Sequence, residues 1–176
     1  MLGYLRLVAG TARLTRTGMA LAPRLLAARL DDGRRDRVKA AIVRRLLTGR
    51  DEAELRVLGR GYAARVVAER LRADTLTRLE AHRAEGHQIV IVSASPALYL
   101  DAVGEQLGVD AVLATNVEVG ADGRLTGELA GANCRRAEKV RRLEAWLGGR
   151  RVELHAYGDS RGDHELLARA DRAVRV

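Results

Sequence analysis

The stretch "HQIVIVSASP", His87–Pro96, decides the fold class of this chain. Its centre is a run of isoleucine and valine that is apolar on both faces, which is typical of a parallel strand buried between helices. Small polar residues follow at once, and Pro96 suits the first position of a helix that ends at Gly108. The stretch therefore predicts a buried strand over 87–93 followed by a helix.

The same alternation continues to the C-terminus. Three further strands are predicted at "DAVLAT" (110–115), "VELHAY" (152–157) and "AVRV" (173–176). Three helices are predicted: one capped by Asp74 and running to Glu85, one over 135–147 and one over 163–170. A hairpin is predicted over 117–129. Alternating strands and helices predict an α/β fold, with a doubly wound parallel sheet over residues 76–176.

Residues 1–75 have a different pattern. Their apolar residues recur at helical spacing without a convincing strand, and "DEAEL" (Asp51–Leu55) places an N-cap aspartate three positions before Glu54. This half is predicted to form three or four short helices that pack together. It also carries 17 Lys+Arg against 8 Asp+Glu, a balance of +9, whereas residues 76–176 carry 14 against 15. The chain's net charge of +8 therefore comes from the N-terminal half.

Composition limits the possible settings and partners. With one cysteine, Cys134, no internal disulfide can form, and the absence of a secretory signal favours a cytoplasmic protein. The uncharged run 17–23 is too short to cross a bilayer. The basic half could attract nucleic acid, acidic lipid or a small anion, or be a solvated helical surface. Few aromatic side chains interleave with it, which disfavours nucleic acid.

Two polar clusters follow predicted strands. Ser93 ends the first strand, and "HAYGDSRGD" places Asp159 at the end of a later one, with Asp163 in the next helical turn. Ligands of open α/β sheets bind at these strand ends, and carboxylates at a glycine-flanked turn suit Mg²⁺. Each residue also has a purely structural interpretation, in which Ser93 ends a strand and Asp163 favours a helix N-terminus.

Lysine usage adds a third candidate. The chain has two lysines, Lys39 and Lys139, among 31 basic residues. A compact ammonium is replaceable by arginine on a surface, but not beside a single phosphoryl oxygen. Lys139 is therefore a candidate anion-binding residue, whereas Lys39 is expected at an exposed position of a helix.

Ser93, Lys139 and the "GDSRGD" turn together resemble motifs two, three and four of the haloacid dehalogenase superfamily. The run "GANCRRAEKVRRL" (131–143) resembles its subfamily IB, the phosphoserine-phosphatase-like branch. The resemblance implies a Rossmann-like core over 76–176, a small helical cap over 1–75, and a Mg²⁺-dependent phosphatase of small phosphorylated metabolites. Ser93 would bind the phosphoryl group, Lys139 would neutralise its charge, Asp159 would ligate Mg²⁺, and Asp163 would support the metal.

The family's first motif, D-x-D-x-T, is absent from this chain. It carries the nucleophilic aspartate at the end of the first strand, which lies mid-sheet between the strands of motifs two and four. We therefore expect a missing central strand, two unpaired strand edges and no turnover by residues 1–176 alone. The start "MLGYLRLVAG" resembles the cap's first helix, so we expect Met1 to be an internal methionine, which the upstream reading frame would test. Asp31-Asp32 is expected to be a turn between cap helices.

Two alternatives remain open at this stage. The chain could be a pseudo-phosphatase that binds phosphate and metal without chemistry, or a binder of anionic surfaces that works through residues 1–75. Other candidates are weaker. Asn133 is expected to cap a loop, and Cys134 has no CxxC partner. No metal-ligand spacing is expected among the four histidines, which are His82, His87, His155 and His164.

Overall fold

The computed structural model of the chain describes residues 1–27 and 32–176. Its N-terminal elements are all helices: α1 (Leu2–Ala9), α2 (Thr11–Ala27), α3 (Asp32–Leu47), α4 (Glu52–Glu69) and α5 (Ala73–Ala84). The alternating part follows, with β1 (Val90–Pro96), α6 (Ala97–Leu107), β2 (Ala111–Thr115), β3 (Val117–Val119), β4 (Leu125–Leu129), α7 (Ala137–Leu147), β5 (His155–Gly158), the 3-10 turn η1 (Arg161–Asp163), α8 (His164–Arg169) and β6 (Arg172–Arg175). The predicted α/β fold class is confirmed.

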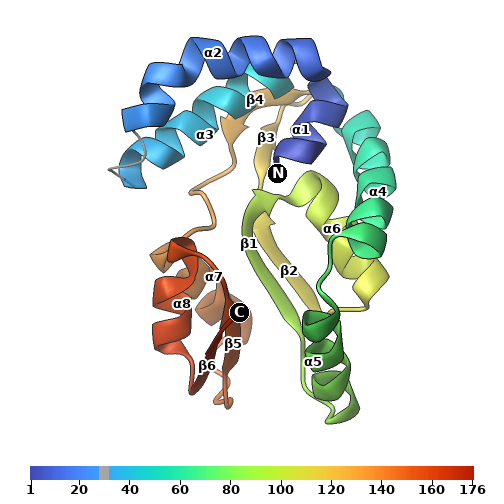
Figure 1. Cartoon of the computed structure of the whole chain (residues 1–176), viewed down its shortest axis with the longest axis vertical. Helices are drawn as coiled ribbons and strands as arrows, with labels where there is room; N and C mark the ends of the chain where they lie inside the picture. The colour runs from blue at the N-terminus through green and yellow to red at the C-terminus, as the bar shows by residue number, and fades with distance from the viewer. Residues whose placement is uncertain (28–31) are drawn as a thin grey trace.

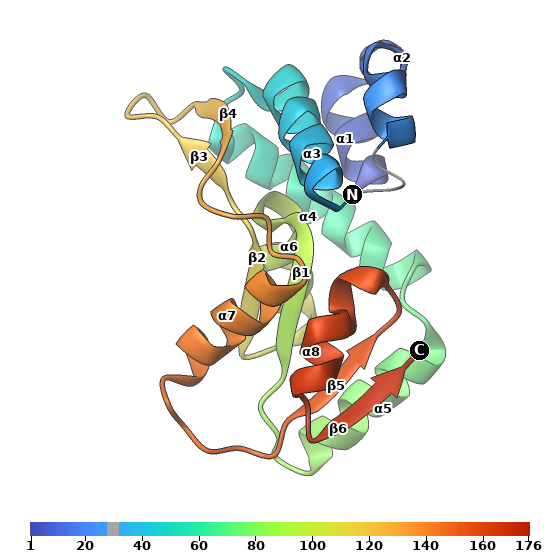
Figure 2. The same ribbon diagram turned by 90° about the vertical axis from the view of Figure 1, so that its left-hand side faces the viewer.

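The strands form three pairs within the described residues. β1 and β2 are parallel, β5 and β6 are parallel, and β3 and β4 form the predicted antiparallel hairpin. In Figure 2, α7 and α8 lie in front of the parallel strands, and α5 and α6 lie behind them. Helices on both sides explain why the β1 sequence is apolar on both of its faces.

Element boundaries differ from the predicted ones where tertiary contacts decide them. Helix α5 begins at Ala73 with Arg72 as its N-cap residue, so Asp74 lies in the first turn and its carboxylate is paired with Arg72. Pro96 precedes α6 rather than opening it. β5 starts at His155, three residues later than predicted, because its pairing with β6 starts there. Asp51 does cap α4, since its Oδ1 accepts from the Glu54 backbone N–H at 3.0 Å. Of the predicted Asp31-Asp32 turn, Asp31 lies outside the described residues, and Asp32 is the first residue of α3.

One hydrophobic cluster joins the N-terminal helices to α6 and the hairpin. Three tyrosines lie at its centre: Tyr4 and Tyr62 are each 5.1 Å from the Tyr99 ring, between centroids. The Tyr4 hydroxyl donates to the Leu55 carbonyl at 2.8 Å, which satisfies a buried polar group. Because this cluster draws on both halves of the chain, α1 and α4 are fixed against α6. The division into a cap (1–75) and a core (76–176) stays a prediction.

A second, smaller cluster joins α7 and α8 to β5, through Leu143, Leu147, Ala156 and Leu166. Figure 1 shows the β5–β6 pair standing apart from the β1–β2 pair. A cavity of about 540 Å³ lies between the two pairs, lined by Val90 and Val92 on one side and by 153–157 on the other. Thus the facing edges of β1 and β5 do not pair with each other within the described residues.

In the part of the chain that the structure describes, no helix combines the length and apolarity needed to cross a membrane.

Candidate active site

Lys139 lies in the first turn of α7, with its side chain only 9% exposed. Its ammonium donates to the carbonyl of Val92 at 2.7 Å and forms an ion pair with Asp163. Regular pairing of β1 with β2 ends at Val92, so the residue after this carbonyl is Ser93. The ammonium therefore connects the end of β1 to the turn that follows β5.

Asp163 organises that turn. Its Oδ1 accepts from Lys139, while its Oδ2 accepts from the Ser160 backbone N–H at 3.0 Å and the Ser160 hydroxyl at 2.6 Å. Ser160 and Asp163 thus form a capping box at η1. A Cβ on Gly158 would lie 2.7 Å from the Cβ of Asp163, so only glycine fits beneath this carboxylate.

The charge of Asp163 is stabilised by these contacts. Burial by itself raises the pKa of the carboxyl group, but the hydrogen bonds from Lys139 and Ser160 and the charge of Lys139 outweigh it, so the pKa lies below the usual value. Both oxygens of Asp163 are thus engaged by Lys139 and Ser160. The expected role of Asp163 in supporting the metal stays a prediction.

Asp159 and Ser93 have more open positions. Asp159 follows β5 directly and is exposed. Ser93 is half-buried, and its Oγ accepts from the Ser95 backbone N–H at 3.1 Å. Of the two predicted metal ligands, only Asp159 presents an exposed carboxylate. An oxygen ligand at this position fits Mg²⁺, which keeps several waters and takes one or two carboxylates from the protein.

The expectation that Lys39 is an exposed residue of a helix is wrong. Lys39, in α3, is only 7% exposed, and its ammonium donates to the carbonyl of Ala94, to Thr115 Oγ1 at 3.0 Å and to Asn133 Oδ1. Ala94 follows Ser93, so this contact ties α3 to the segment that holds the candidate phosphate site. Burial lowers the pKa of Lys39 to about 8, although nearby Asp36 opposes the change.

Asn133 is part of the same buried network. Its Oδ1 also accepts from the Thr115 hydroxyl at 2.9 Å, and its amide donates to Asp36 of α3 at 2.5 Å. It therefore links the loop before α7 to α3, which is more than the local loop cap that the sequence predicts. The rarity of lysine in this arginine-rich chain singles out Lys39, but it does not indicate the distant residues that accept from its ammonium.

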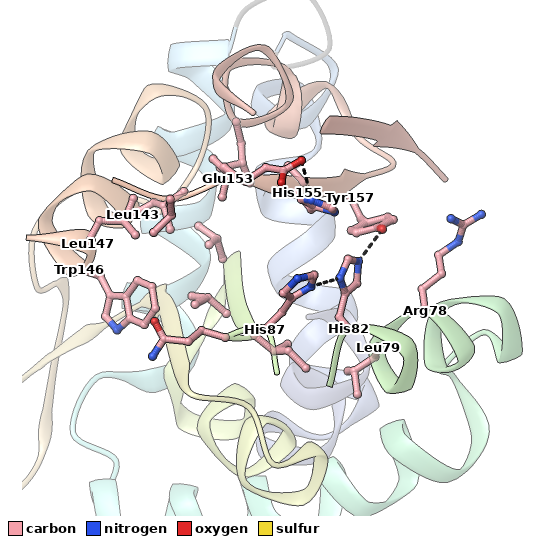
Figure 3. A pocket seen from close by; sticks show the side chains of 18 of the residues that line it. Arg78, Leu79, His82, His87, Leu143, Trp146, Leu147, Glu153, His155 and Tyr157 are labelled. Carbon is pink, nitrogen blue, oxygen red and sulfur yellow. Dashed lines mark hydrogen bonds and ion pairs between the residues drawn. The ribbon is translucent and has the colours of Figure 1, made fainter. Parts of the chain in front are cut away.

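The histidines also behave differently from expectation. His82, His87 and His155 converge at the wall of the cavity, with ring centroids 5.1 to 5.6 Å apart (Figure 3). His82, Glu85 and His87 place ligand-type atoms within 4.8 Å of one another. The H-x-x-E-x-H spacing of residues 82–87 could have indicated part of this cluster, but the approach of His155 depends on the fold.

Comparisons with known proteins bear on the family and the fold of this chain. The family model of the haloacid dehalogenase-like hydrolases matches residues 1–168. Protein CicA of Caulobacter vibrioides is 39% identical over 153 residues, which cover 87% of this chain and 68% of CicA.

Solved structures show the same fold. A Bordetella pertussis protein of unknown function superposes with a TM-score of 0.79 at 24% identity, covering 98% of this chain and 79% of that one. A probable phosphoserine phosphatase from Vibrio cholerae superposes with a TM-score of 0.73 at 20% identity, covering 99% of this chain and 51% of that one. The family match over nearly the whole length shows that this chain belongs to the haloacid dehalogenase-like hydrolases.

Proposed function

We propose that this chain forms most of a Mg²⁺-dependent phosphomonoester hydrolase that acts on a small phosphorylated metabolite. The observation that carries the proposal is the buried Lys139 ammonium, which is held by Asp163 and by the carbonyl that precedes Ser93. A fixed positive charge beside a strand-end serine suits a phosphoryl group, since phosphoryl transfer depends mainly on positioning and charge neutralisation.

Each residue has a distinct role in this proposal. Ser93 hydrogen-bonds the phosphoryl oxygens, and Lys139 neutralises their charge. Asp163 acts as a positioning residue that holds the Lys139 ammonium in place, and it also supports the metal. Asp159 holds the Mg²⁺ ion, which when bound would supply further neutralisation of the phosphoryl group.

The nucleophile belongs, in this proposal, to a strand between β1 and β5. Support comes from the unpaired facing edges of these strands and the cavity between them. Backbone N–H and C=O groups at such edges require partners, and a parallel strand would supply them to both sides. By family resemblance this strand ends in D-x-D-x-T, whose first aspartate would attack phosphorus. Residues 1–176 contain no such motif, so they should not turn over substrate alone.

Phosphoserine is the first substrate to try, because the Vibrio cholerae relative is described as a probable phosphoserine phosphatase. The cytoplasmic setting expected from the single cysteine is part of the same proposal.

Phosphate binding tests the roles without requiring turnover. Inorganic phosphate with Mg²⁺ should raise the melting temperature of residues 1–176, because a ligand that binds the folded state stabilises it. Ser93→Ala and Lys139→Met should abolish the shift due to phosphate, and Asp159→Asn should abolish the additional shift due to Mg²⁺. Because Lys139→Met leaves Asp163 unpaired, the milder Ser93→Ala variant is the decisive one. A phosphate shift that Ser93→Ala leaves unchanged would contradict the proposed site.

A further inference from the structure

The convergence of three histidines and a glutamate lies apart from the residues of the proposed phosphatase site. His82 lies in α5, Glu85 is the C-cap residue of that helix, and His87 belongs to the loop before β1. His155 opens β5 on the other side of the cavity, as Figure 3 shows. Ser93 and Asp159, in contrast, lie towards the other ends of β1 and β5.

The spacing of the ligand atoms suits one transition-metal ion. The Nδ1 atoms of His82 and His87 lie 2.8 Å apart, and Glu85 Oε2 lies 3.5 Å from His87 Nδ1. Two nitrogens bound to one tetrahedral Zn²⁺ at about 2.0–2.1 Å are roughly 3.4 Å apart. A small outward rotation of the two rings would therefore admit the ion without a change in the backbone.

The surroundings of His82 favour the ligand-competent form. Its Nε2 lies 2.7 Å from the Tyr157 hydroxyl, so a proton on Nε2 can be donated to that oxygen, which leaves Nδ1 with a lone pair for a metal. A hydrogen-bonded outer partner of this kind is typical of histidines that bind metals.

His155 lies beside this group but is not one of its ligands. Its ring centroid lies 5.1 Å from that of His82 and 5.6 Å from that of His87, and its Nε2 lies 3.4 Å from Glu153 Oε1. The ligand-type atoms that lie within 4.8 Å of one another belong to His82, Glu85 and His87. The site therefore takes its three protein ligands from the segment 82–87, on one side of the cavity.

We propose that His82, Glu85 and His87 form a binding site for a Zn²⁺-type transition-metal ion, with water in the fourth position. Imidazole nitrogens with one carboxylate are the donors that Zn²⁺ takes in proteins, whereas Mg²⁺ prefers oxygen ligands alone. The site is thus chemically distinct from the proposed Mg²⁺ position at Asp159. Its effect would be structural, since the ion would tie the end of α5 to the loop before β1.

Calorimetric titration of the tag-free chain with ZnCl₂, after removal of metals by a chelator, tests this site. We expect one equivalent of Zn²⁺ to bind and to raise the melting temperature, with an affinity that excess Mg²⁺ does not change. His87→Ala removes an exposed ligand and should weaken binding by at least about 100-fold, more than the loss of an outer partner costs. Tyr157→Phe removes only the outer hydroxyl and should weaken it about tenfold.

His164→Ala provides the matched control, because His164 is the one histidine outside the cluster, and Asp159→Asn controls for binding at the proposed Mg²⁺ position. Neither should change Zn²⁺ affinity. Three results would overturn the site: the chain does not bind one equivalent of Zn²⁺, the His87→Ala variant binds it equally well, or either control variant loses binding. The cluster would then be only a hydrogen bond between two imidazoles. None of these outcomes bears on phosphatase activity.

Discussion

Both lysines of this chain are buried, in contrast to most of its 29 arginines. Lys39 and Lys139 are each 7% exposed, and each ammonium donates to a backbone carbonyl in β1, Ala94 and Val92 respectively. An ammonium is a compact group with three donors, whereas a guanidinium is a planar fork that needs a wider space. At the scale of single residues, the choice of lysine therefore reflects two narrow sites on either side of Ser93.

Lys39 should make stability depend on pH in the alkaline range. Its pKa is about 8 in the folded chain, compared with about 10.4 for an unfolded lysine. Between these values the unfolded chain binds the proton and the folded chain does not, so the free energy of unfolding rises with pH. The full effect is on the order of 3 kcal/mol.

Urea unfolding at pH 7 to 10.5 measures this dependence, with Lys39→Met as the reference chain. The wild-type chain should gain stability over the reference across this range, because methionine has no proton to lose. If the free energy of unfolding changed with pH in the same way for both chains, burial would not destabilise the Lys39 ammonium.

The sequence indicated the candidate residues of the site, but not their contacts. Strand-end positions and lysine usage singled out Ser93, Lys139 and the 159–163 turn, and the family resemblance supplied their roles, which stay proposals. The burial of Lys39 could not be foreseen, because its acceptors lie 55, 76 and 94 positions away in the sequence. The same holds for Asp163, whose pairing with Lys139 needs the turn after β5 to fold back on α7.

At the scale of elements, the contact between α4 and α6 fixes the N-terminal helices on the alternating part. Gly59 of α4 is buried against the backbone of α6, and a Cβ there would overlap the Leu98 carbonyl oxygen. Gly61, two residues later in the same helix, has open space around it. The helical periodicity of residues 1–75 indicated helices, but it could not show which glycine permits this close approach.

Alanine at these two glycines should have opposite effects. Gly59→Ala should lower the free energy of unfolding by about 1–3 kcal/mol or more, because the helices must move apart. Gly61→Ala should raise it by about 0.5–1 kcal/mol, since alanine favours an exposed helical position over glycine. Thermal or urea unfolding of both variants measures this, and a Gly59→Ala variant as stable as Gly61→Ala would contradict the close packing of α4 on α6.

Element boundaries were predicted within a few residues where local signals decide them, as for the Asp51 cap and the Gly108 end of α6. They were less accurate for strands, since β5 is paired with β6 only from His155 onward. A strand end depends on the register with its neighbour, and a neighbour is a tertiary contact that one segment does not encode.

At the scale of the whole molecule, the main feature is the cavity between the two parallel strand pairs, β1–β2 and β5–β6. The absence of D-x-D-x-T from the sequence predicted a central strand missing between β1 and β5, and the facing edges of these strands are unpaired within the described residues. The Lys139 ammonium contacts Val92 of β1 and Asp163 in the turn after β5. Both strand pairs therefore help to position the candidate site. What fills the cavity is therefore the central question.

A peptide complementation assay tests this account most directly. The peptide is an apolar strand ending in D-x-D-x-T, and the matched control carries asparagine in place of the first aspartate. Trp146, the single tryptophan, lines the cavity, so its fluorescence reports whether either peptide enters.

The measurement is Mg²⁺-dependent phosphate release from phosphoserine and a general aryl phosphate, with residues 1–176 alone and with each peptide. The account predicts no release by the chain alone, binding of both peptides, and release only with the aspartate peptide. Mg²⁺-dependent release by the chain alone would contradict it, as would a peptide that binds without activity or one that does not bind at all.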